Sequence, residues 1–177
     1  MKRKSRQDEL YEEAGAAYNH ALERLVRAYE ADPDKQRDLL QEVHLALWQS
    51  FERYQERCSL RTWVYRVAHN TAVSHIVREY RTKARKWVSL LEVEFAADPE
   101  PSHGITDRQM ALEQLMNLIR RLKPFDRELM LLYLEGMDAE SIGDVAGISA
   151  GNVRVQVHRI KAVLARRFHG GSHERQL

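Results

Sequence analysis

Apolar residues recur at intervals of three and four along most of the chain, which places them on one face of an α-helix. No long segment alternates strictly between apolar and polar residues, as a half-buried strand would. The sequence therefore predicts an all-α protein. The expected helices cover 8–31, 35–53, 59–86, 107–123, 124–134, 139–146 and 150–168.

One interruption of this pattern is long. From 88 to 107 there is no Lys or Arg, whereas acidic residues and two prolines, Pro99 and Pro101, are present. Such a stretch is typical of a linker. We interpret 87–107 as an acidic, flexible linker between two small helical domains at 8–86 and 108–168, with a flexible tail at 169–177. Pro33 separates the first two helices, and Asp34 is expected to cap the second.

Composition narrows the class of protein. A hydrophobic content of 44% allows packed cores and argues against a disordered chain. The single cysteine, Cys58, excludes an internal disulfide and favours a reducing compartment. No apolar run approaches the ~20 residues of a membrane span, and the basic start is not followed by a signal-peptide segment. We therefore expect a cytoplasmic protein that is not inserted in a membrane.

Positive charge is concentrated in one helix. Between Arg57 and Lys86 there are eight basic residues and one acid, a net charge of +7 in a chain whose net charge is +2. Ser59 is the expected N-cap of this helix. Trp63 and Tyr65 near its start and Asn70 midway suit a polyanion that also offers bases, namely a nucleic acid. The alternative is a solvated helix whose arginines extend along its surface.

The segments beside the basic helix also offer candidate contacts. The loop 54–58 has an aromatic residue, Tyr54, and an arginine, Arg57, near its ends, so it could hold an unpaired base. An ordinary packed tyrosine is the alternative. In the helix 35–53, Asp38, Gln41 and Glu42 lie away from most of the apolar stripe. They are either solvated or a docking face for a basic partner.

The segment 138–167 has the order of a helix-turn-helix: a short helix, a tight turn at Gly147, and a longer helix. Ser149 is the expected N-cap of that longer helix. The charged residues of this helix, from 150 to 168, are all basic. Those from 126 to 144 are all acidic except Arg127. We expect the second helix to enter a DNA groove, with a generic basic hairpin as the alternative. The side chains able to reach bases or phosphates are Arg154, Gln156, His158 and Arg159.

Residue patterns that carry catalysis are not found. The sequence has no glycine-rich phosphate loop, no HExxH, no cysteine pair and no nucleophile elbow. We therefore expect no catalytic residues, no metal site and no cofactor. The chain is expected to act by binding and not as an enzyme.

Three stretches together resemble the ECF (extracytoplasmic-function) sigma factors of bacterial RNA polymerase. They are DLLQEVHLALW at 38–48, LRTWVYRVAHN at 60–70 and RELMLLYLEGMDAESIGDVAGISAGNVRVQVHRIK at 127–161. The resemblance covers most of 10–168. It implies a sigma factor that directs core RNA polymerase to promoters and initiates transcription. The first domain would be region two, which melts the minus-ten element, and the second would be region four, which reads the minus-thirty-five element as duplex.

The resemblance also implies roles for individual residues. Asp38, Gln41 and Glu42 look like polymerase-binding residues. In the first domain, the residues that look like contacts to the single-stranded minus-ten element are Tyr54, Arg57, Ser59, Arg61, Arg66 and Asn70. In the second, the residues at groove-facing positions are Arg154, Val155, Gln156, His158 and Arg159. Members of the family are commonly held by an anti-sigma factor, which the resemblance implies here too.

Some positions depart from the family pattern. Val155 is apolar where the family usually has a polar or basic residue, so it can meet a thymine methyl but cannot donate a hydrogen bond to a base. Gly143 stands where alanine is common, and we expect it to loosen its helix by roughly 1 kcal/mol. These departures bear on which upstream sequence is preferred.

Two other functions fit part of the sequence. One is a stand-alone helix-turn-helix regulator that binds a duplex palindrome as a dimer and needs no polymerase. The other is an interaction module that mimics a sigma factor without binding DNA. The basic surface between Arg57 and Lys86 argues against the second.

Overall fold

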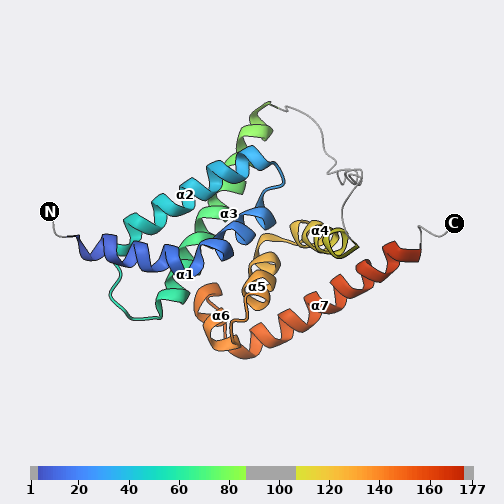
Figure 1. Cartoon of the computed structure of the whole chain (residues 1–177). Helices are drawn as coiled ribbons and strands as arrows, with labels where there is room; N and C mark the ends of the chain where they lie inside the picture. The colour runs from blue at the N-terminus through green and yellow to red at the C-terminus, as the bar shows by residue number, and fades with distance from the viewer. Residues whose placement is uncertain (1–3, 87–106, 174–177) are drawn as a thin grey trace.

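The computed structural model describes residues 4–86 and 107–173, and these ranges contain seven α-helices and no strand (Figure 1). The predicted all-α class is confirmed. The predicted linker, 87–107, lies almost wholly outside the described residues. The helices are α1 (Arg6–Tyr29), α2 (Pro33–Phe51), α3 (Leu60–Lys86), α4 (Asp107–Arg120), α5 (Pro124–Leu134), α6 (Ala139–Ala146) and α7 (Ala150–His173).

The first three helices begin at identifiable caps. The side chain of Ser5 accepts from the backbone N–H of Asp8, whose carboxylate accepts in return from the Ser5 N–H, which makes a capping box for α1. The α2 cap is Asp32 and not Asp34, because Pro33 occupies the first helical position and the Asp32 carboxylate accepts from the Asp34 N–H. Ser59 caps α3 as predicted, with its Oγ 3.1 Å from the Thr62 nitrogen.

Helices α1, α2 and α3 pack against one another as a bundle. Its core is formed by the apolar stripes of the predicted helices, with exceptions. Val77, an apolar position of the basic helix, is 43% exposed. Trp48 is 40% exposed, because its position falls at the edge of the α2 stripe, and Tyr65 is buried. The buried residues of the bundle include Leu22, Leu25, Val26, Leu39, Val43, Leu47, Phe51, Val64, Ala68 and Ala72.

Helices α4 to α7 form the second bundle, in which α6 and α7 make the helix-turn-helix. Gly147 closes α6 with a φ of 73°, the left-handed conformation in which glycine has no steric penalty. Ser149 caps α7 through its Oγ, 3.3 Å from the Asn152 nitrogen. Helix α7 continues to His173, past the Phe168 expected from the sequence, because glycine weakens a helix without forbidding its geometry.

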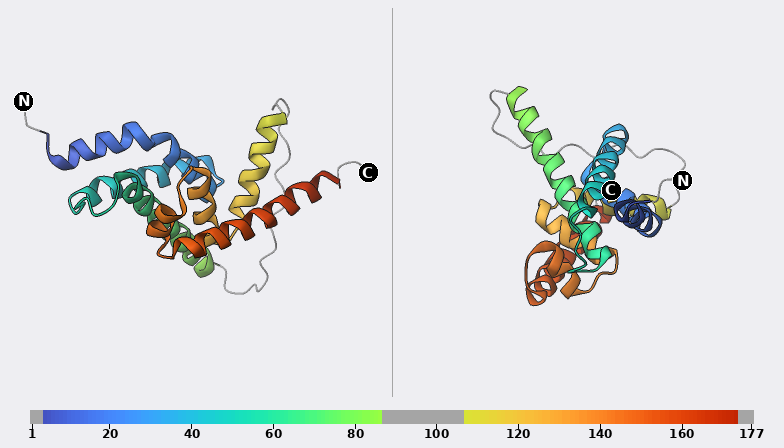
Figure 2. Two further views of the ribbon diagram at one scale, coloured as in Figure 1. Left: turned by 90° about the horizontal axis from the view of Figure 1, so that it is seen from below. Right: turned by 90° about the vertical axis from the view of Figure 1, so that its left-hand side faces the viewer.

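The two bundles are packed together. Helix α1 contacts α4, and α3 contacts α5 and α6, while α7 packs on the other side of α4, α5 and α6 (Figure 2). Arg127 at the start of α5 is buried, with its guanidinium 5.1 Å from the centre of the Tyr29 ring in α1. It also donates to the Leu122 carbonyl at 3.1 Å, which helps to close the end of α4. A basic side chain of α5 thus packs against an aromatic ring of α1 across this boundary.

Candidate nucleic-acid interface

The loop before α3 is held by its own tyrosine. Tyr54 is 8% exposed, and its hydroxyl donates to the Cys58 carbonyl at 2.8 Å. Its ring centre lies 5.3 Å from that of Trp63, and the Trp63 indole N–H donates to the Ser50 hydroxyl at 2.9 Å. Of the two roles open to Tyr54 from the sequence, the packed tyrosine is the one observed. Its ring shapes the loop and is not free to receive a base.

A hollow of about 420 Å³ lies between this loop and α3. Three arginines and an aromatic wall surround it, so it offers cations for phosphates beside a surface for a planar base. Arg57 and Arg66 were predicted as minus-ten contacts and Trp63 as a residue suited to a nucleic acid, whereas Arg53 was not predicted. Arg53 could have been found as a second arginine in the short stretch around Tyr54. The lining residues are Arg53, Tyr54, Gln55, Arg57, Cys58, Trp63, Arg66 and Asp144.

Asn70 lies further along α3 and is exposed. Its neighbour His69 is buried, with Nδ1 2.9 Å from the Tyr29 hydroxyl. Burial lowers the pKa of His69 to about 3, so the ring is neutral at physiological pH. His69 therefore adds no charge to the basic helix. Its contact with α1 fixes the rotation of α3, which leaves Asn70 on the outer face.

Arg61 and Arg66 are engaged by the second bundle. The Arg61 guanidinium donates to the backbone carbonyl of Glu135, and that of Arg66 donates to the carbonyl of Asp144. Arg61 also lies over the Tyr65 ring, 5.8 Å from its centre. Two side chains predicted to contact the minus-ten strand are thus occupied by α5 and α6 in this arrangement.

The predicted docking face on α2 is only partly exposed. Asp38 and Gln41 face solvent. Glu42 faces α3 and accepts from Arg78 at 2.6 Å, with His75 Nδ1 3.5 Å away. A partly exposed ion pair between α2 and α3 thus accounts for Glu42. Leu45 lies beside this face and is 57% exposed. Its exposure could have been predicted from the sequence, because its position is out of phase with the buried apolar stripe of α2.

The second candidate surface is the outer face of α7. Arg154, Val155, His158 and Arg159 are exposed, and Gln156 is half-buried. Val155 is 67% exposed, more than the other exposed large apolar side chains of the described residues. The residues predicted to face a DNA groove are thus exposed except for Gln156, and their contact with DNA stays a prediction.

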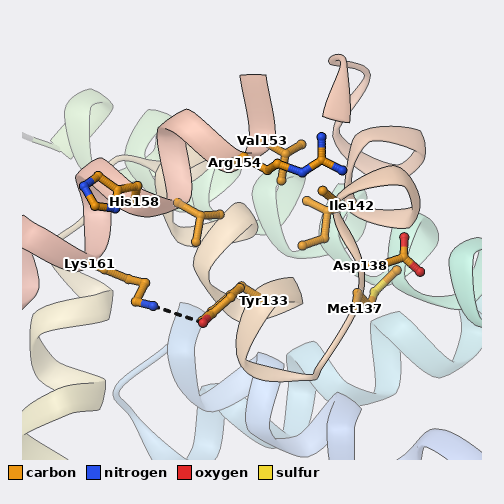
Figure 3. Close-up of a pocket in the computed structure, with 10 residues that line it drawn as sticks. Tyr133, Met137, Asp138, Ile142, Val153, Arg154, His158 and Lys161 are labelled. Carbon is orange, nitrogen blue, oxygen red and sulfur yellow. Dashed lines mark hydrogen bonds between the residues drawn. The ribbon is translucent and has the colours of Figure 1, made fainter. Parts of the chain in front are cut away.

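A groove of about 370 Å³ runs beside this surface, between α7 and the junction of α5 with α6 (Figure 3). Its floor is apolar, with Ile142 and Val153, and its rim carries Arg154, His158 and Lys161. Arg154 is 3.2 Å from Glu140, and Lys161 donates to the Tyr133 hydroxyl at 3.1 Å. Arg154 and Lys161 outweigh Asp138, the one acid of the lining, so this side of α7 favours an anionic partner.

Two further features of the described residues bear on other functions. None of the helices in 4–86 and 107–173 is long and apolar enough to cross a membrane. Within the same ranges, no three or more His, Cys, Asp or Glu side chains are grouped so that they could hold a metal ion.

Comparison with family models matches the two bundles separately. Residues 16–82 match sigma-70 region 2, and residues 112–164 match sigma-70 region 4. The chain is 24% identical over 157 residues to the RNA polymerase sigma-H factor of Pseudomonas aeruginosa, covering 83% of this chain and 80% of that protein. It is 23% identical over 154 residues to the ECF RNA polymerase sigma-E factor of Escherichia coli K12, with the same coverages.

Solved structures share the arrangement of helices. The sigma factor RpoE of Bartonella quintana, determined with the anti-sigma factor NepR, superposes with a TM-score of 0.66 at 18% identity, over 88% of this chain and 94% of that one. CnrH in complex with the cytosolic domain of CnrY gives a TM-score of 0.63 at 18% identity, over 90% and 88%. At this identity the likeness establishes the fold, which extends across both bundles.

Proposed function

The chain belongs to the ECF (extracytoplasmic-function) family of RNA polymerase sigma factors, and we propose that its two bundles divide the recognition of a promoter between them. As a sigma factor it directs core polymerase to specific promoters. In our proposal α1–α3 bind the polymerase and the opened minus-ten element, and α7 binds the minus-thirty-five element as duplex. The chain acts by binding, without catalysis of its own, in the cytoplasm where core polymerase works.

The observation that carries the minus-ten assignment is the hollow between the loop 52–59 and α3. In this proposal a flipped base of the non-template strand enters it beside Trp63, and Arg57 and Arg66 contact the flanking phosphates. Arg61 contacts the strand backbone, and Asn70 on the outer face of α3 hydrogen-bonds to it. Stacking contributes ~1–3 kcal/mol per base, which offsets the cost of opening the duplex. Ser59 and Tyr54 shape the loop that borders the hollow.

The minus-thirty-five assignment rests on the exposed face of α7. Arg154 and His158 reach base edges from the first turns of the helix, and Arg159 reaches a phosphate. The exposed Val155 contacts a thymine methyl, which is the apolar feature of the major groove. Gln156, half-buried, serves at the edge of the interface.

For the polymerase we propose the exposed part of α2. Asp38 and Gln41 supply polar contacts, and Leu45 and Trp48 supply apolar area beside them. Glu42 acts indirectly by holding α3 through Arg78. We also propose an anti-sigma factor as a regulatory partner, because one of the structural neighbours above was determined with such a factor bound.

The experiment that tests this function is gel filtration of the purified chain with sigma-free bacterial core polymerase, followed by run-off transcription from a promoter library. Co-elution with new transcription start sites is the expected result, and the start sites identify both elements. A chain that does not co-elute but binds a duplex palindrome by itself is a stand-alone regulator, and the proposal is then wrong.

A further inference from the structure

The end of α2 lies beside the first turns of α1, and hydrogen bonds between side chains join the two helices there (Figure 1). The Trp48 indole N–H donates to Asp8 Oδ1 at 3.1 Å, and the Gln7 side-chain amide donates to the Trp48 carbonyl at 2.7 Å. One turn further along α1, the Tyr11 hydroxyl lies 3.1 Å from His44 Nδ1, and the two rings meet edge to face. Consecutive residues of α1 thus hold both the ring and the backbone of Trp48.

These contacts do not belong to the core of the bundle. None of residues 6–13 in α1 is buried, and the first buried side chain of this helix is Ala14. Leu10 and Tyr11 pack only at the edge of the core. The first two turns of α1 therefore contribute little apolar burial, and their polar contacts with α2 are made where Trp48 lies.

The Asp8 carboxylate is held from two sides. Its Oδ2 accepts from the Ser5 backbone N–H at 3.2 Å and from the Ser5 hydroxyl at 2.8 Å, whereas its Oδ1 accepts from Trp48. The hydrogen bonds from Trp48 and Ser5 keep the pKa of Asp8 below its ordinary value, so the carboxylate is ionised at neutral pH. An ionised acceptor strengthens the hydrogen bond to the indole. The capping box of α1 thus fixes the acceptor that orients the Trp48 ring.

The orientation of this ring matters because Trp48 is 40% exposed near the end of α2. Packing covers only part of the ring, and the hydrogen bond to Asp8 adds a direction that packing leaves open. Tryptophan is enriched among the side chains that dominate binding energy at protein interfaces. Fixing such a side chain before association reduces the entropy that binding costs. Trp48, with Leu45, is the apolar part of the α2 surface proposed above to bind polymerase.

We propose that Asp8 is a positioning residue for polymerase binding: from the first turn of α1 it holds the Trp48 indole in the orientation that docks on core polymerase. This inference rests on the proposed polymerase-binding surface of α2. Asp8 acts through Trp48 and needs no contact with polymerase itself. The residues that determine polymerase binding then begin at the start of α1, thirty positions before Asp38.

The test measures the affinity of the full chain for immobilised core polymerase by biolayer interferometry. Asp8→Ala removes the acceptor of the indole hydrogen bond. Glu9→Ala is the matched control, because Glu9 is an exposed acid in the same first turn and its loss changes the charge near the helix dipole equally. Ser5→Ala is a second control that removes the N-cap side chain and leaves the Asp8 contact with Trp48 available. All three substitutions lie outside the core, so the variants are expected to fold.

Asp8→Ala is expected to weaken polymerase binding roughly fivefold, the effect of losing about one hydrogen bond. Both controls are expected to bind within about twofold of the wild type, which is the scale of a change at an exposed position. The proposal is overturned if Asp8→Ala binds as tightly as Glu9→Ala. It is also overturned if Ser5→Ala weakens binding as much as Asp8→Ala, because the helix cap would then explain the whole effect.

Two readouts separate positioning from a merely structural role. Trp48→Phe keeps an aromatic ring but has no indole N–H, so adding Asp8→Ala to it is expected to cause no further loss of affinity. An equal loss in both backgrounds would show that Asp8 does not act through the indole. In chains labelled with 5-fluorotryptophan, the ¹⁹F resonance that disappears in Trp48→Phe belongs to Trp48. It is expected to shift in Asp8→Ala and not in Glu9→Ala, and an unshifted resonance would refute the orienting contact.

Trp48→Ala distinguishes this inference from the function proposed above. If the wild type does not bind core polymerase, the proposed function fails and the inference fails with it. If the wild type binds and Trp48→Ala binds equally well, the polymerase-binding surface on α2 is wrong. If Trp48→Ala weakens binding and Asp8→Ala does not, only the positioning role of Asp8 is wrong.

Discussion

Gly143 lies at a point in α6 where a methyl group has no room. A Cβ built on it would be 2.5 Å from the Ile148 carbonyl oxygen, which is roughly 1 Å short of ordinary contact. That oxygen belongs to the backbone of the helix-turn-helix turn and not to a flexible side chain. The Gly143 carbonyl accepts from the Gly147 nitrogen at 2.8 Å and the Ile148 nitrogen at 3.2 Å, so the turn is fixed where the clash occurs.

Helix propensity and packing oppose each other in Gly143→Ala. Alanine stabilises a helix interior by about 1 kcal/mol relative to glycine. Forcing an extra methyl into a close-packed site costs ~1–3 kcal/mol through displaced backbone. Because the obstacle is backbone, we expect the cost to exceed the gain, with a net loss of up to about 2 kcal/mol in the free energy of unfolding. The sequence alone predicted the opposite sign.

Urea unfolding followed by circular dichroism measures the change. Gly15→Ala in α1 and Gly151→Ala in α7 are matched controls: a Cβ meets nothing within 4 Å at Gly15, and only the Ser149 Oγ at 4.0 Å at Gly151. Both are expected to be neutral or to stabilise by up to about 1 kcal/mol. If Gly143→Ala unfolds at a urea concentration equal to or above that of the controls, the close approach of Ile148 does not constrain α6.

Other predictions address the proposed contacts and one buried acid. Asn70→Ala is expected to lower promoter opening about tenfold while leaving closed-complex binding intact; unchanged permanganate reactivity at minus-ten thymines, with Ser74→Ala as the control, would contradict it. Arg154→Ala is expected to cost ~1–3 kcal/mol and relax the preference among upstream-element variants in a binding assay; an unaltered preference would remove Arg154 from base readout. Asp38→Lys is expected to weaken co-elution with core polymerase, and elution at wild-type strength would exclude that face. Burial raises the pKa of Glu128 to about 7 from an ordinary 4.5, so its ionisation opposes folding above pH 7 and this penalty disappears as the pH falls toward 4.5. Glu128→Gln is therefore expected to raise the free energy of unfolding near pH 8 by ~1–2 kcal/mol with little change near pH 4.5, and a gain that does not depend on pH would refute the assignment.

Local features of the chain were predictable because they depend on neighbours in sequence. Three- and four-residue spacing of apolar positions identified the helices, since one turn of helix brings those positions to one face. Ser59 and Ser149 were recognisable as caps, and Gly147 as the turn of the helix-turn-helix, from the same local rules. The basic character of α3 and of the outer face of α7 follows directly from composition.

Features that depend on which faces meet were decided only by the tertiary structure. Periodicity identifies an apolar face but not its neighbour, so it could not separate a packed Tyr54 from one open to a base, or show Glu42 paired with Arg78. Periodicity also could not show the lack of room at Gly143. The Ile148 carbonyl that an added methyl group would meet belongs to the turn that follows α6.

The contact of Arg24 with Glu135 joins residues that are 111 positions apart in the chain. Arg24 lies outside the three family-like stretches and Glu135 lies inside the third, but each by itself reads as an ordinary surface charge. Sequence alone established which surfaces of this protein are basic. The packing of the bundles determined that one of these surfaces is covered by the helix ends of the other bundle, because long-range contacts depend on the complementary shape and charge of whole faces.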